Sequence, residues 1–142
     1  MNFPILSSLI LLPSVGALFI LITGSSVKSN FKSSRYVALF ASFANFIISI
    51  YLWYIFDSNI ADFQFVENRI WLKGFINYKV GIDGISILFI ILTTLISSLC
   101  IVSVNKTINV KLKEFLIAIL LMESLMIGVF CSLDLVIFYL FF

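Results

Sequence analysis

Glu123 is the residue of this chain whose type and position most directly indicate chemistry. It lies inside an apolar run, eight positions after Phe115 and eight before Cys131. An ionised carboxylate in the middle of a membrane costs several kcal/mol, so an acid at such a position indicates a functional site. The run from Phe115 to Cys131 holds no Lys or Arg. Glu123 is therefore expected to be protonated, hydrogen-bonded to a neutral partner, or paired with a residue that this chain lacks. Its two candidate roles are proton handling and tying helices together as a neutral acid.

Two sets of small polar residues recur at helical spacing in other apolar runs: Ser42, Asn45 and Ser49, and Thr93, Ser97 and Cys100. Residues three, four or seven positions apart share one face of a helix. Such stripes usually pack helices together in membranes, and a chain of waters that carries protons is the alternative. Asn45 or Thr93 is expected to hydrogen-bond the neutral Glu123 carboxyl.

Asp83 and Asp134 each come directly before an apolar run. A carboxylate there accepts hydrogen bonds from the free N–H groups of a helix's first turn, so capping is the expected role of both. Glycines flank Asp83, at Gly81 and Gly84, and predict a tight turn beside the cap.

Composition narrows the protein class before any element is assigned. Of the 142 residues, 62% are hydrophobic and 11% are charged, whereas soluble domains carry roughly 25% charged residues. A water-soluble domain is therefore excluded, and a net charge of +2 without a basic stripe excludes nucleic-acid binding. The chain has no His and two Cys, so a zinc cluster, a Ser-His-Asp triad and a disulfide scaffold are excluded as well. No catalytic residue and no metal site are expected.

The apolar runs predict an all-α integral membrane protein, a single membrane domain over 1–142 with four transmembrane helices plus a truncated fifth. The spans are expected at about 3–23, 36–56, 85–104 and 115–131, with a partial helix at 134–142. The first run is expected to be a retained helix and not a signal peptide, because no basic residue precedes it. The fifth would end halfway across the bilayer with unpaired carbonyls, so we expect an N-terminal portion of a longer protein.

The long polar stretch from Asp57 to Asp83 separates the second and third spans. Its segments 63–65 and 70–72, followed by Gly74, predict short strands or interfacial segments, and Trp71 and Tyr78 suit the depth of the lipid headgroups. The long stretch holds three of the nine Lys and Arg, and the two short loops hold the other six: Lys28, Lys32, Arg35, Lys106, Lys111 and Lys113. Basic short loops stay cytoplasmic, so the N-terminus and the long stretch are expected outside.

Two motifs resemble a known family, the antiporter-like subunits of respiratory complex I. The stretch YKVGIDGIS, from Tyr78 to Ser86, resembles the entry into their third helix. The stretch LMESLMIGVFCSLDLVIFYLFF, from Leu121 to Phe142, is similar to chain M, called subunit 4 in mitochondria. The Asp-Gly-Ile-Ser element is shared with multisubunit cation/proton antiporters, whereas the Tyr-Leu-Phe-Phe ending favours chain M over the related chain L.

The resemblance implies a part of a proton-translocating subunit, covering about the first third of a full family member. In that family protons cross through buried Glu and Lys residues, driven by quinone reduction elsewhere in the complex. The family's main glutamate directly follows the Phe-Phe pair and would come after Phe142, and its pumping lysines lie on later helices. Glu123 is thus expected to be an accessory proton carrier at most, and the chain is not expected to pump alone.

The expected partners are the other membrane subunits of complex I and the lipid bilayer, in the bacterial inner membrane or alternatively the mitochondrial inner membrane. The sequence has no glycine-rich phosphate loop and no cysteine cluster, so NADH, flavin, iron–sulfur clusters and quinone are expected in partner subunits. Two alternatives remain open: a subunit of a cation/proton antiporter, and a membrane scaffold that moves no protons.

Overall fold

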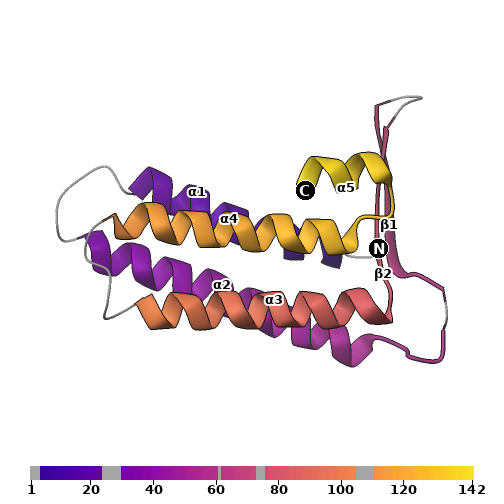
Figure 1. Ribbon diagram of the computed structural model, residues 1–142, viewed down its shortest axis with the longest axis horizontal. Coiled ribbons are helices and arrows are strands. Elements are labelled where there is room, and N and C mark those ends of the chain that lie inside the picture. Colours follow the sequence, from indigo (N-terminus) through magenta and orange to yellow (C-terminus); the bar gives the residue numbers. More distant parts are fainter. Residues whose placement is uncertain (1–3, 24–29, 61, 73–75, 105–110) are drawn as a thin grey trace.

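The computed structural model describes residues 4–23, 30–60, 62–72, 76–104 and 111–142. Four long helices lie side by side, each antiparallel to the next along the chain (Figure 1). They are α1 (Ile5–Thr23), α2 (Asn30–Ile55), α3 (Gly84–Ser103) and α4 (Leu112–Cys131). Each is long and apolar enough to cross a membrane. The prediction of an integral membrane protein with four spanning helices is confirmed.

Two helices begin earlier than the hydrophobic pattern predicted. α2 starts at Asn30 and not near Tyr36, and α4 starts at Leu112 and not at Phe115. Lys32, Arg35 and Lys113 are thus helical and not loop residues. Lys and Arg are good helix formers, and apolar composition marks only the part of a helix that lies in lipid. Three residues with a predicted place lie outside the described residues: Phe3 of the first span, and Lys28 and Lys106 of the short loops.

A β-hairpin stands across one end of the bundle (Figure 1). Its strands β1 (Gln64–Leu72) and β2 (Ile76–Ile82) are antiparallel. The segments 63–65 and 70–72, predicted as separate short strands or interfacial pieces, both fall on β1 except for Phe63, and β2 was not predicted. The backbone between α4 and the last helix joins β2, because Leu133 N–H donates to the Lys79 carbonyl at 3.0 Å. Gly74 and the side chain of Trp71 lie outside the described part of the hairpin.

The last helix, α5 (Leu135–Phe141), lies beside α4 at the hairpin end (Figure 1). It approaches α4 closely at Gly128, where an added Cβ would come within 2.7 Å of the Phe141 ring. The absence of a side chain at Gly128 is what lets the Phe141 ring pack there. The predicted short fifth helix is confirmed.

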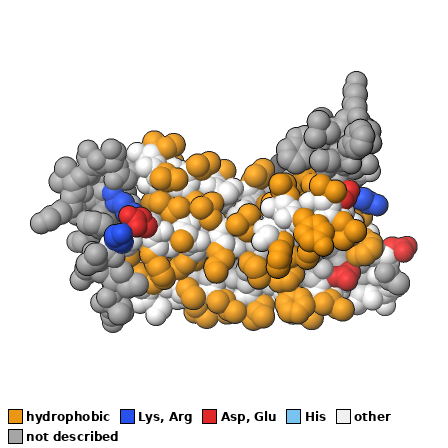
Figure 2. Space-filling model, turned by 45° about the horizontal axis from the view of Figure 1, so that its top comes forward, with side chains coloured by type: hydrophobic (Ala, Val, Ile, Leu, Met, Phe, Trp, Pro, Cys, Tyr) orange, Lys and Arg blue, Asp and Glu red, His pale blue; other side chains and the backbone are white. Residues whose placement is uncertain are grey.

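The bundle interior holds two apolar clusters, one near the hairpin and one near the opposite end. The first includes Leu6, Leu52, Ile90 and Ile127. The second includes Ala17, Ala41, Ile101, Leu116 and Leu120. Outside, apolar side chains cover the length of the bundle, and acidic and basic side chains gather at its two ends (Figure 2). An apolar exterior between charged ends is the surface that a bilayer requires.

Candidate functional site

A layer of buried polar side chains separates the two apolar clusters. It consists of Ser42, Asn45, Ser49, Thr94, Ser97, Glu123 and Ser124. These residues come from α2, α3 and α4, and each lies near the middle of its helix. The layer therefore crosses the bundle at about half its height. Burying polar groups is costly unless they are hydrogen-bonded, so the contacts inside this layer decide what it can do.

Glu123 forms the central contact of the layer. Its carboxyl is 2% exposed, and its Oε1 accepts a hydrogen bond from Asn45 Nδ2 at 2.7 Å. The structure thus brings Glu123 together with Asn45, one of the two partners considered from sequence. The bond joins α2 to α4 through two side chains separated by 78 positions. Within the described residues Glu123 forms no salt bridge, and Lys111 lies about 18 Å away along the helix.

One oxygen on each side of this contact has no partner among the described residues. They are Glu123 Oε2 and Asn45 Oδ1, both buried. A protonated carboxyl has an O–H donor, which an ionised carboxylate lacks, and an amide oxygen is an acceptor. A protonated Glu123 therefore offers the hydrogen-bond donor that Asn45 Oδ1 lacks. An ionised Glu123 offers none, so Glu123 Oε2 and Asn45 Oδ1 would both remain acceptors without a donor.

Hydroxyl groups fill the rest of the layer. Ser49 Oγ and Thr94 Oγ1 lie 2.9 Å apart, which links α2 to α3. Ser124 Oγ donates to the Ile10 carbonyl at 2.6 Å, which links α4 to α1. Ser42 and Ser97 donate to carbonyls of their own helices. The layer thus ties all four helices together through hydrogen bonds.

A pocket of about 270 Å³ opens beside Glu123. Glu123 itself, Thr93, Ser97 and Cys100 supply its polar lining, and Ile96, Ile119, Met122 and Met126 supply the rest. The hydroxyls of Thr93 and Ser97 donate to carbonyls of α3, so the wall of this pocket is mostly apolar. The Glu123 carboxyl therefore borders a mostly apolar pocket at the middle of the bundle.

The stripe predicted on the third span is only partly a packing surface. Thr94 and Ser97 are buried, whereas Thr93 is half-buried and Cys100 is exposed. The Thr93 hydroxyl donates to the Phe89 carbonyl of its own helix. Thr93 and Glu123 line the same pocket, but no hydrogen bond joins them among the described residues. Within that part of the chain, the Thr93 hydroxyl thus bonds within its own helix and not to another one. Positions 93 and 94 both have helical spacing to Ser97, so sequence spacing did not distinguish them.

The two predicted capping residues lie at helix starts in the hairpin half of the molecule. Asp83 Oδ1 accepts from the Ser86 N–H at 2.7 Å at the start of α3. Asp134 Oδ1 accepts from the Val136 N–H at 2.9 Å at the start of α5. Hydrogen bonds from Ser86 hold the pKa of Asp83 below its ordinary value. A Cβ added at Gly84 would meet no neighbouring atom, and the φ of Gly84 lies outside the left-handed region. Position 84 therefore does not require a glycine, as the predicted tight turn would.

A third cap was not visible in the sequence. The carboxylate of Glu67, on β1, accepts from the N–H groups of Leu6 and Ser7 at 2.9 and 3.3 Å and from the Ser7 hydroxyl. It satisfies the free donors at the start of α1 from a strand about 60 positions later. Caps are sought within a few residues of a helix start, and no local signal links Glu67 to α1.

The part of the chain that the structure describes holds no group of three His, Cys, Asp or Glu side chains that could bind a metal ion. Its buried polar side chains are one carboxyl, one amide and several hydroxyls, and Cys131 adds a buried thiol. These groups can hold, donate and accept protons.

Comparison with known proteins gives relatives that match along the chain. NADH-quinone oxidoreductase subunit M of Rickettsia prowazekii is 43% identical over 143 residues, which is 100% of this chain and 29% of that protein. NADH-ubiquinone oxidoreductase chain 4 is 44% identical in Marchantia polymorpha and 45% identical in Arabidopsis thaliana, over 96% of this chain and 27% of those proteins. No family model matches the chain.

The chain thus spans less than a third of the length of these curated relatives. Their names agree with both motifs, the Tyr78–Ser86 stretch and the Leu121–Phe142 stretch. The chain is a relative of the subunit M and chain 4 family of NADH:quinone oxidoreductases, as those motifs predicted.

Proposed function

We propose that this chain is part of a proton-translocating membrane subunit of an NADH:quinone oxidoreductase, with Glu123 as an accessory proton-handling group. The observation that carries the proposal is the pairing of Glu123 with Asn45 in a buried polar layer, with no salt bridge to Glu123 among the described residues. A carboxyl without a counter-ion in lipid holds its proton at rest, because the charged form is costly there. In this proposal Glu123 releases the proton only transiently, to a neighbouring hydrogen-bonding group.

The surroundings of Glu123 support a proton that enters and leaves. The pocket lined by Thr93 and Ser97 leaves room beside the carboxyl on one side, and in this proposal a proton-carrying water reaches Glu123 there. The hydroxyls of Ser49 and Thr94 continue the polar layer beyond Asn45 on the other side. Hydroxyl groups both donate and accept hydrogen bonds, so they can pass a proton between neighbouring waters.

In this proposal the rest of the reaction belongs to other chains. The redox chemistry with NADH, flavin, iron–sulfur clusters and quinone takes place in partner subunits, and the other membrane subunits of the complex are the direct partners. The membrane is the bacterial or mitochondrial inner membrane, in keeping with relatives from both bacteria and plants. The chain binds no nucleic acid, and it does not catalyse proton transport by itself.

A purely structural role for Glu123 is the second candidate, and the same hydrogen bond favours it. The contact between Asn45 and Glu123 joins α2 to α4, and a neutral acid makes that contact as well as a proton carrier does. The two roles differ in one respect. A structural acid needs only an acceptor oxygen, whereas a proton carrier needs a group that ionises.

The substitution Glu123→Gln separates these roles, because the glutamine oxygen still accepts from Asn45 but the side chain releases no proton. We expect the assembled complex to form in normal amounts and to pump fewer protons per NADH oxidised. Glu114→Gln is the matched control, since it makes the same change on the same helix at an exposed position. Unchanged pumping in Glu123→Gln would leave the structural role as the correct one.

A further inference from the structure

Two side chains stand beside the Glu123 carboxyl, one on each neighbouring helix. Asn45 of α2 donates to Glu123 Oε1 at 2.7 Å, which leaves Glu123 Oε2 without a partner among the described residues. Ser97 of α3 interacts with the same carboxyl through its hydroxyl. Ser97 and Glu123 are both buried, and both line the pocket of about 270 Å³. A protonated Glu123 can therefore turn its O–H toward Asn45 Oδ1 or toward Ser97 Oγ.

These two acceptors differ in what they can do with a proton. The amide of Asn45 has an oxygen that accepts hydrogen bonds and N–H groups that donate them, but it does not pass a proton on. The hydroxyl of Ser97 is donor and acceptor at one oxygen, so it can take a proton from one neighbour while it gives its own to another. Asn45 is thus suited to hold Glu123, and Ser97 is suited to exchange its proton.

The hydroxyl of Ser97 is also loosely held. Its bond to the Thr94 carbonyl measures 3.1 Å, whereas hydroxyl hydrogen bonds are typically about 2.7–2.8 Å long. Thr93 lines the same pocket, but its hydroxyl donates to the Phe89 carbonyl at 2.7 Å. The Ser97 O–H can therefore turn away from its own helix more easily than the Thr93 O–H can.

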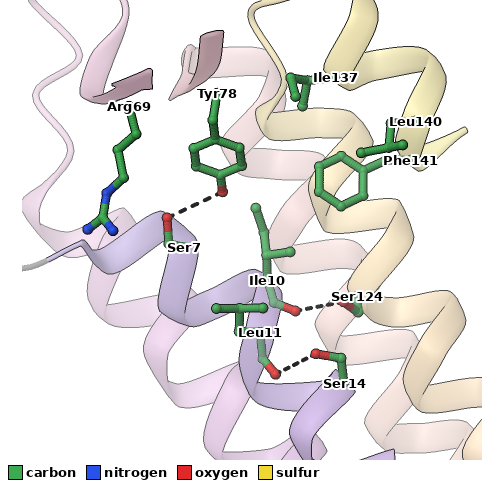
Figure 3. Close-up of a pocket in the computed structure, with 10 residues that line it drawn as sticks. All are labelled: Ser7, Ile10, Leu11, Ser14, Arg69, Tyr78, Ser124, Ile137, Leu140 and Phe141. Atoms are coloured by element: carbon green, nitrogen blue, oxygen red, sulfur yellow. Dashed lines mark hydrogen bonds between the residues drawn. The ribbon is translucent and has the colours of Figure 1, made fainter. Parts of the chain in front are cut away.

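Ser124, the residue after Glu123, has a hydroxyl that serves a different contact. It donates to the Ile10 carbonyl of α1 at 2.6 Å, a bond that Figure 3 shows at the wall of another pocket. Glu123 is not among the described residues that line that pocket. Ser124 thus joins α4 to α1 and does not connect Glu123 to the space beside Ser97.

We propose that Ser97 is the group through which Glu123 exchanges its proton, while Asn45 holds the carboxyl in place. Glu123 Oε2 gives its proton to Ser97 Oγ as the Ser97 O–H gives its own proton to a water molecule in the pocket. The products are a Glu123 carboxylate, an unchanged serine hydroxyl and a protonated water, and the reverse step restores the acid. The inference rests on the function proposed for Glu123, because it names the route of that proton.

Hydrogen–deuterium exchange of the Glu123 carboxyl tests this route without requiring turnover. The full chain in lipid nanodiscs is transferred to heavy water, and the protonated carboxyl band, identified by its loss in Glu123→Gln, moves to lower wavenumber as O–H becomes O–D. We expect Ser97→Ala to keep the band and to slow its shift about 10²-fold, the lower end of what a positioned proton-transfer group contributes. Ser97→Thr keeps the hydroxyl and should restore most of the wild-type rate.

Ser98→Ala is the matched control. It makes the same change one position along α3, where the Ser98 hydroxyl donates to the Leu95 carbonyl at 2.9 Å and another side of the helix is presented. Thr94→Val tests the opposite route, because it removes the hydroxyl that contacts Ser49 and keeps the backbone carbonyl. Both variants should exchange at the wild-type rate.

Unchanged exchange in Ser97→Ala would overturn the proposal, since water would then reach the carboxyl without the serine. Equal slowing in Thr94→Val or Ser98→Ala would overturn it as well, and so would the absence of a protonated band. The function proposed for Glu123 fails separately, by normal pumping of the assembled complex with Glu123→Gln. Reduced pumping in that variant together with unchanged exchange in Ser97→Ala would refute the route alone.

Discussion

Glu67 and Leu6, 61 positions apart, are joined by a hydrogen bond of 2.9 Å from the Leu6 N–H to the Glu67 carboxylate. A bulge in β1 makes this contact possible. Two residues, Phe65 and Val66, face one residue of β2 between the pairs Gln64–Ile82 and Glu67–Val80, and Phe65 has φ 54°. Because of the extra residue, the Glu67 side chain lies on the same face of the hairpin as its partner Val80. Val80 is fully buried, so this face is the one that packs on the bundle.

Loss of the Glu67 carboxylate should loosen the start of α1. We expect Glu67→Ala to lower the free energy of unfolding by about 1 kcal/mol, as loss of a helix cap does. Glu67→Gln should cost less, since its amide oxygen still accepts. Hydrogen exchange at the Leu6 and Ser7 amides, measured in lipid nanodiscs, should quicken in Glu67→Ala. Asn68→Ala changes the exposed neighbour and serves as the control, and equal exchange in both variants would contradict the capping role.

The contact between α1 and α2 depends on two small residues. A Cβ added at Gly16 would lie 2.8 Å from the Ala41 Cβ, so Gly16→Ala should cost about 1–3 kcal/mol through overpacking. Ala41→Gly makes room, and the double variant should therefore recover part of that loss. Equilibrium unfolding in mixed micelles gives the coupling between the two sites. Strictly additive effects would show that the helices do not meet there.

The cap at Asp83 predicts an acid-sensitive start of α3. Hydrogen bonds from Ser86 lower the pKa of Asp83 from its ordinary value of 3.8. The folded form thus favours the carboxylate, so its contribution to stability is complete above about pH 4 and is lost as the pH falls through the lowered pKa. Unfolding followed from neutral to acidic pH should show this loss in the wild type and not in Asp83→Asn. Parallel pH profiles would refute the prediction.

Glu123 is expected to be protonated near neutral pH. It is buried, its partner Asn45 is neutral, and it forms no salt bridge within the described residues. Infrared difference spectra should therefore contain a protonated carboxyl band that disappears in Glu123→Gln. Glu114→Gln should leave that band in place. A carboxylate band alone would mean that water or an additional cation stabilises the charge.

The two ends of the bundle should face opposite sides of the membrane. The start of α2 and the hairpin lie at opposite ends (Figure 1), and the short loops hold six of the nine basic residues. Reporter fusions after Lys32 and after Asn68 should report the cytoplasmic and the outer side respectively. Reports from the same side would contradict the four-span topology.

The sequence by itself determined the membrane class, the four spans, the short fifth helix and the place of Glu123 inside an apolar helix. These follow from local properties: the length of an apolar run, the cost of a charge within it and the spacing of residues along one helix. The motif around Asp83 and the ending after Asp134 also pointed to the same proteins that the comparison found as relatives.

Only the tertiary structure decided which residues meet. Asn45 and not Thr93 bonds Glu123, Thr94 and not Thr93 is buried, and Glu67 caps a helix about 60 positions away. The rotation of each helix about its axis is set by close packing, as at Gly16 and Gly128, and not by its own periodicity. One inserted residue moves every following side chain of a strand to the opposite face of the sheet. The bulge at Phe65 and the resulting orientation of Glu67 therefore depend on contacts between distant segments, which a local sequence pattern does not contain.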